Sequence, residues 1–217
     1  FTRFRARALN AVMGAKMVED KQRGYDKPIS SCNFSSKLDD SVVDALHEAV
    51  GSVGADQCAR FYQLKFALMG KAGAQPWSER NANVPFASKE KVSWDKTKKL
   101  VLEAYGSFSP TLESLVKKII DSNWVDVYPR KGKSGGAYNF SATMPDGEYS
   151  FNFLNHQGSV RDVVTAAHEL GHGVHGLLAG EAQGPLMQSA PMVYAETASI
   201  FGEMITFQHL LTTVKDD

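Results

Sequence analysis

The sequence has no excess of charge of either sign. Lysine and arginine together number 24, and aspartate and glutamate together also number 24, in a chain of 217 residues. A balanced chain has no global field that would draw it to nucleic acid or to an anionic membrane surface. We therefore expect neither nucleic acid nor a membrane as a partner.

Cysteine and long apolar runs are also scarce. Cys32 and Cys58 are the only two cysteines; their positions match no metal-ligand spacing, and two are too few for a disulfide scaffold. No apolar run approaches the roughly 20 residues that span a bilayer. The basic residues of the first 24 positions are dispersed, unlike those of a secretory signal. These absences favour a reducing, intracellular location.

Helical periodicity dominates what is present. Apolar residues recur every three to four positions in segments bounded by glycine, proline and capping residues, which predicts helices over residues 2–23, 40–51, 54–69, 93–106, 110–122, 160–179 and 192–212. Between 124 and 155 the pattern changes to short β-rich runs, and "EYSFNFLN" alternates as a strand does. The fold class expected is mainly α: one mostly helical region with a helical part over 1–123, and a part over 124–217 that carries a small antiparallel sheet before the next helix.

The segment "TAAHELGHGVHGLL" places three histidines and one glutamate on a predicted helix. Residues four apart lie on the same helix face, so His168 and His172 can both reach one metal ion. Glu169 is displaced by about 100° and can reach a water beside that ion. This is the chemistry of HExxH, in which two histidines bind zinc and the glutamate is a general base. The sequence therefore predicts a site for one Zn²⁺ ion.

A catalytic zinc usually has a third protein ligand. A third histidine ten residues after the first is excluded, because that position is Leu178. Glu181 would have to turn back from the same helix, whereas Glu196 lies 24 residues past His172, far enough for the chain to return on an antiparallel helix. We assign Glu196 to the metal, and Glu203, seven residues further on, to a position behind a ligand imidazole, which it could orient.

Other candidate site residues follow from their proximity to the motif. His175 shares the helix and is either a partner behind the ligands or an ordinary helix histidine. The strand residues Phe151, Asn152, Phe153 and Leu154 could hold a peptide in extended form by main-chain hydrogen bonds. Gly135 and Gly136 could let a peptide backbone approach closely, or could simply form a flexible loop.

These motifs resemble a known family. "HELGHGVH", followed by "PMVYAETASIFGE", is similar to the thimet oligopeptidase and oligoendopeptidase F family of zinc peptidases. "VEDKQRGYDKPISS" and "DVYPRKGKSGGAY" are similar to segments that precede the zinc helix in the oligoendopeptidase F branch, so the resemblance extends from about residue 4 to 212.

The resemblance implies a zinc metalloendopeptidase that hydrolyses internal bonds of short peptides, usually in the cytoplasm. It implies His168, His172 and Glu196 as zinc ligands and Glu169 as general base. In the family, tyrosines and histidines that bind substrate follow the second zinc helix at some distance, so we expect this chain to be the central part of a longer peptidase. Two alternatives remain open: a module that binds zinc or peptide without cutting, and a metal-dependent carboxypeptidase.

Overall fold

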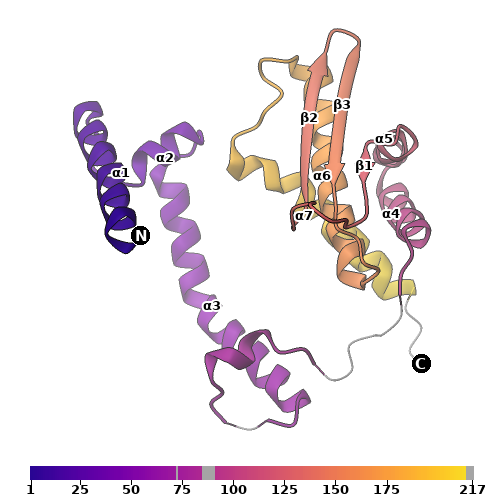
Figure 1. Ribbon diagram of the computed structural model, residues 1–217, viewed down its shortest axis with the longest axis horizontal. Coiled ribbons are helices and arrows are strands. Elements are labelled where there is room, and N and C mark those ends of the chain that lie inside the picture. Colours follow the sequence, from indigo (N-terminus) through magenta and orange to yellow (C-terminus); the bar gives the residue numbers. More distant parts are fainter. Residues whose placement is uncertain (72, 85–90, 214–217) are drawn as a thin grey trace. The chain divides into compact units, whose positions relative to one another are not determined.

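The chain forms two compact units, Phe1–Ser88 and Lys89–Asp217. They are seen in a computed structural model that describes residues 1–71, 73–84 and 91–213 (Figure 1). The fold is mainly helical with a small sheet, as expected from the sequence. The expected boundary between residues 123 and 124 lies inside the second unit, where helices give way to strands.

The first unit consists of helices, and its described residues include no buried apolar side chain. Its elements are α1 (Thr2–Arg23), α2 (Ser30–Ser35), α3 (Asp40–Leu68) and a 3₁₀ helix (Trp77–Asn81). Helix α1 ends where Gly24 adopts the left-handed conformation, with φ of 73°. Among the described residues of this unit only Asn33 is buried, where its side-chain amide donates a hydrogen bond to Asp40. Polar contacts and helix propensity thus define this unit more than packing does.

The prediction of two helices over 40–51 and 54–69 was wrong, because α3 is continuous. Gly51 and Gly54 both lie within it. A glycine weakens a helix interior by about 1 kcal/mol relative to alanine but does not remove a backbone donor as proline does. Two glycines near the middle of a helix of 29 residues therefore do not end it.

The second unit has a core shared by three helices. Helices α4 (Trp94–Phe108) and α5 (Pro110–Asp121) pack against α6 (Val160–Gln183), and α7 (Met192–Thr213) packs against α4 and α6. The core residues are apolar and almost fully buried: Val101, Tyr105, Val116, Ile119, Val163, Ala167 and Leu170. None of the helices in the described part of the chain is both long and apolar enough to cross a membrane.

The sheet is mixed, and the expectation of an antiparallel sheet was wrong for one of its strands. Strands β2 (Tyr138–Met144) and β3 (Gly147–Phe153) form an antiparallel hairpin. Strand β1 (Val125–Asp126) pairs with β3 in parallel, which gives the order β1-β3-β2. The long connection from β1 to β2 carries the chain past the position of β3, so β3 lies in the middle and β2 at an edge.

Helix α6 lies along one face of the β2–β3 hairpin (Figure 1). Glycines on this helix make a close approach possible. A Cβ atom on Gly173 would come within 2.7 Å of the Ser150 hydroxyl, and one on Gly176 would overlap Ser141. These contacts bring the first residues of β2 down onto the part of α6 that carries the histidines.

Candidate active site

Helix α6 begins at Val160, eight residues before His168, and its start is fixed by its own cap. The Ser159 hydroxyl accepts a hydrogen bond from the Asp162 backbone N–H, and the Asp162 carboxylate accepts one from Ser159 in return. Such a capping box satisfies two backbone donors that a helix start otherwise leaves unpaired. The histidines follow in the third to fifth turns, well inside the helix.

His168, His172 and Glu196 converge on one point. One Glu196 carboxylate oxygen lies 3.3 Å from Nε2 of His168 and 3.6 Å from Nε2 of His172. The three ligand atoms all lie within 4.8 Å of one another. Two imidazole nitrogens and one carboxylate oxygen form a donor set suited to a divalent transition metal. The structure thus brings together the three residues that the sequence singled out as ligands.

Glu196 reaches the histidines because α7 crosses α6 at a glycine. A Cβ atom on Gly171 would lie 2.7 Å from the Ala198 carbonyl oxygen and 2.8 Å from Cα of Ser199. The two backbones therefore touch where any larger residue would separate them. The Ser199 hydroxyl also donates to the Glu196 carboxylate over 2.8 Å, which orients that carboxylate.

Glu203 lies behind His168, as the sequence suggested. Its carboxylate is 3.3 Å from Nδ1 of His168, on the opposite side of the ring from Glu196. A carboxylate in this position favours the tautomer that leaves Nε2 as an acceptor and holds the ring in place.

Glu169 is buried beside the cluster, with 6% of its surface exposed. Burial raises the pKa of this carboxyl group to about 7, the charge of His168 opposes that rise, and the charge of Glu196 adds to it. Burial likewise lowers the pKa of His172, which favours its neutral, ligating form. The site therefore favours the neutral form of the His172 imidazole and gives the Glu169 carboxyl group a pKa of about 7.

A pocket of about 470 Å³ opens over the cluster. On the α6 side, this histidine pocket is lined by His168, Glu169, His172 and His175. On the sheet side it is lined by Ala137 and the start of β2, Tyr138 to Ser141, and at its rim by residues 188–190. His175 thus faces the same space as the ligands, although it is not one of the three converging residues. Glu181 is nine positions past His172, about two and a half turns, and so lies on the opposite side of α6.

The backbone of Phe151, Asn152, Phe153 and Leu154, which the sequence suggests as a place for a peptide, forms hydrogen bonds within the sheet. Strand β3 is paired on both sides, with β2 along its whole length and with β1 at Asn152 and Phe153. The Leu154 N–H also donates to the Asp126 carbonyl over 2.9 Å. In the described part of the chain, β2 borders the histidine pocket and has a strand partner on one side only.

Gly135 and Gly136 lie in the loop before β2. Gly136 has a φ of 89°, a conformation that favours glycine. It lines a second pocket of about 370 Å³, which also contains Glu169, Asn155 and Arg161. We call this the Asn155 pocket. Ala137 and Glu169 line both pockets, so the two adjoin at the buried glutamate.

Sequence reasoning missed two parts of this site. The position of β2 beside the histidine pocket follows from the strand order, which no local pattern reveals. Gln188 is buried, donates to the Gly176 carbonyl over 2.9 Å, and forms part of the pocket rim. The proline- and glycine-containing stretch around it indicated only a connection between two helices.

Comparison with known proteins agrees with this geometry. Residues 103–217, more than half of the chain, match the sequence profile described as Peptidase family M3. The chain belongs to this family. It is 29% identical over 127 residues to "Oligopeptidase PepF" of Bacillus subtilis, covering 58% of this chain and 18% of that protein. It is 26% identical over 196 residues to "Oligoendopeptidase F homolog" of Lactococcus lactis, covering 90% of this chain and 31% of that protein.

Solved structures agree on the fold of this M3 chain. A Bacillus anthracis structure assigned as an oligoendopeptidase F matches with a TM-score of 0.75 at 17% identity, over 94% of this chain and 38% of the other. At that identity the match establishes the fold alone. The M3 chain spans about a third or less of the length of the curated relatives named above.

Proposed function

We propose that this M3 chain carries the zinc site of a metalloendopeptidase that cleaves internal bonds of short peptides. The observation that supports it most is the convergence of His168, His172 and Glu196 beside the buried Glu169. In a tetrahedral site with bonds of about 2.0–2.1 Å, neighbouring donor atoms are about 3.3–3.4 Å apart. The Glu196 oxygen lies 3.3 Å from Nε2 of His168 and 3.6 Å from Nε2 of His172, close to this spacing, which supports a zinc ion.

Each side chain then has a distinct role. His168, His172 and Glu196 would hold the ion, and Glu203 would orient the His168 ring. Zinc bound there would supply Lewis acidity toward water and toward the scissile carbonyl. Glu169 would accept a proton from the attacking water and deliver it to the leaving amine.

The peptide would add as a strand at the free edge of β2. Strand addition uses main-chain hydrogen bonds and so accepts many sequences, as expected of an enzyme for varied short peptides. The first residues of β2 line the histidine pocket, so a peptide paired there would pass the metal cluster and Glu169. A cytoplasmic location is part of the proposal, and the exposed free thiols of Cys32 and Cys58 suit a reducing compartment.

Zinc analysis of three variants tests the site. We expect about one zinc per chain in the parent, a loss of affinity of about tenfold or more in Glu196→Ala, and no change in the matched variant Glu181→Ala. Glu169→Gln should keep its zinc. Equal zinc affinity in Glu196→Ala and Glu181→Ala would remove Glu196 from the site.

Peptide cleavage tests the reaction. A protein of the relatives' length that contains this chain should cleave an internally quenched peptide blocked at both ends, which excludes a carboxypeptidase. Glu169→Gln in that protein should lower the rate by about a hundredfold or more. A Glu169→Gln protein that binds zinc and retains full turnover would refute the role of Glu169.

A further inference from the structure

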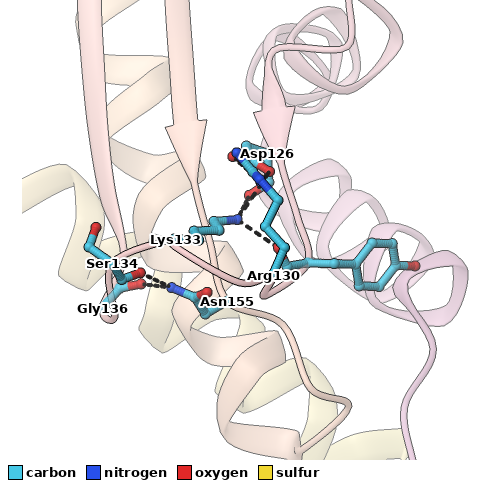
Figure 2. Close-up of polar contacts among 7 residues, drawn as sticks. Asp126, Arg130, Lys133, Ser134, Gly136 and Asn155 are labelled. Carbon is cyan, nitrogen blue, oxygen red and sulfur yellow. Dashed lines mark hydrogen bonds and ion pairs between the residues drawn. The ribbon is translucent and has the colours of Figure 1, made fainter.

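The loop from Val127 to Ala137 joins β1 to β2 and contains three glycines, yet it is fixed at both ends. The start of the loop is held by the side chain of Lys133, which is almost fully buried. It donates hydrogen bonds to the carbonyls of Asp126 and Tyr128. Lys133 also pairs with the Asp126 carboxylate, which Arg130 contacts through two hydrogen bonds of 2.7 and 2.8 Å (Figure 2). This end of the loop is therefore closed by charged hydrogen bonds, which are stronger than neutral ones.

At its other end the loop is fixed by a single side chain. Both hydrogen bonds come from the Asn155 amide nitrogen, which donates to the carbonyls of Ser134 and Gly136 over 2.9 Å each (Figure 2). An asparagine amide has two N–H donors, so these bonds use its full donor capacity. Asn155, which lies outside the loop in sequence, thus holds the backbone on both sides of Gly135, up to the residue before Ala137.

The clamped segment borders the proposed reaction centre. Gly136 lines the Asn155 pocket, and Ala137 lines both this pocket and the histidine pocket. Glu169 also lines both, so Ala137 and the proposed general base border the same two pockets. The Gly136–Ala137 backbone immediately precedes β2, the strand to which a peptide would pair.

We propose that Asn155 is a positioning residue that holds the Gly136–Ala137 backbone as a preformed rim for the peptide substrate. Fixing a loop in its bound conformation raises affinity because binding no longer has to order it. Without the Asn155 clamp, residues 135 and 136 would sample the many conformations open to glycine. This inference rests on the proposed function, since it assigns the rim to peptide binding.

The test compares Asn155→Asp and Asn155→Ser with Asn10→Asp. Aspartate has the shape of asparagine without the donors, serine is too short to span both carbonyls, and Asn10 is an exposed residue of α1 that supplies the same charge change. Amide hydrogen exchange is measured at residues 134–138. Binding of a dansylated, amide-capped alanine–phenylalanine oligopeptide is measured in the Glu169→Gln background, and zinc affinity is measured in parallel.

We expect both Asn155 variants to exchange about tenfold or more faster at residues 134–138 and to bind the peptide about tenfold more weakly, with zinc affinity unchanged. Asn10→Asp should match the parent in all three. Unchanged exchange, or faster exchange with unchanged peptide affinity, would overturn the inference. A parallel loss of zinc affinity would also overturn it, because it would indicate a general structural role. A parent that binds zinc but no peptide would instead refute the proposed function, and the role of the rim with it.

Discussion

The imidazole of His168 lies between two carboxylates, with Glu203 3.3 Å from its Nδ1 atom. Glu196 lies at the same distance from its Nε2 atom. One glutamate thus faces the Nε2 side of the ring, and the other faces its Nδ1 side. The two glutamates are seven residues apart on α7, or about two helical turns, which places both on the face directed toward α6.

This arrangement predicts that Glu203→Ala weakens zinc binding without abolishing it. A partner behind a ligand histidine is typically worth about ten- to a hundredfold in metal affinity. Competition with a chromogenic chelator measures the change. Glu181→Ala, which removes an exposed glutamate of α6 on the side away from His172, serves as the control. Equal affinity in the two variants would mean that the Glu203 contact does not support the site.

Gly171→Ala is predicted to destabilise the protein and to weaken zinc binding. Its new methyl group would press on the backbone of Ala198 and Ser199, so α7 must shift away from α6 and move Glu196. Overpacking of this kind costs about 1–3 kcal/mol. Gly14→Ala is the contrasting control, because no atom lies within 4 Å of its Cβ position and alanine favours a helix over glycine. Urea unfolding should therefore give a lower free energy of unfolding for Gly171→Ala than for the parent protein, and a higher one for Gly14→Ala.

Tyr105 and Gly202 are predicted to be energetically coupled. The buried Tyr105 hydroxyl donates to the Ala167 carbonyl over 2.8 Å and occupies the space that a side chain on residue 202 would need. Tyr105→Phe should cost about 1 kcal/mol for the lost hydrogen bond. Gly202→Ala should cost more in the parent than in the Tyr105→Phe background, where the hydroxyl is gone. A double-mutant cycle of unfolding free energies measures the difference, and strict additivity would contradict it.

The second unit is predicted to lose stability as the pH falls below about 6.5 because of His156. Burial lowers the pKa of this histidine, against the opposing charge of Asp162, while its neighbours Thr97 and Trp94 are uncharged. Above its unfolded pKa, His156 is neutral in both states and has no effect. Below it, the unfolded chain binds a proton that the folded chain resists, so stability falls until the folded pKa is passed.

Unfolding free energies between pH 7.5 and 5 test this in the parent and in His156→Gln. The parent curve should be steeper over about pH 6.5–5, by up to about 1.4 kcal/mol per pH unit, which corresponds to one proton. Parallel curves would show that His156 titrates alike in the folded and unfolded chain.

The convergence of His168, His172 and Glu196 could be predicted from the sequence because most of its parts are local. The spacing of His168 and His172 has a fixed meaning on a helix, and the cap at Ser159 indicates where that helix begins. Predicting Glu196 required one further inference, that the chain returns on a second helix antiparallel to the first. The apolar residues around Glu196 and the seven-residue interval to Glu203 were enough to identify the correct face of α7.

The environment of the cluster was not accessible in the same way. Strand order depends on which strands meet across long connections, so the alternation of "EYSFNFLN" identified β3 as a strand but not as the central one. The clamp on Gly136 likewise depends on Asn155, nineteen residues away in sequence. Local patterns showed that the loop contains glycines, whereas its rigidity comes from contacts that form only when the chain folds.

The exposed edge of β2 also bears on how the protein behaves in concentrated solution. Its backbone donors and acceptors on that side have no strand partner among the described residues, and Tyr138, Phe140 and Met144 are more than half exposed along it. An unprotected edge of this kind is a template on which another extended chain can pair, including the same strand of a neighbouring molecule. An edge that is open to many peptides therefore favours self-association, and a peptide bound along β2 would suppress it.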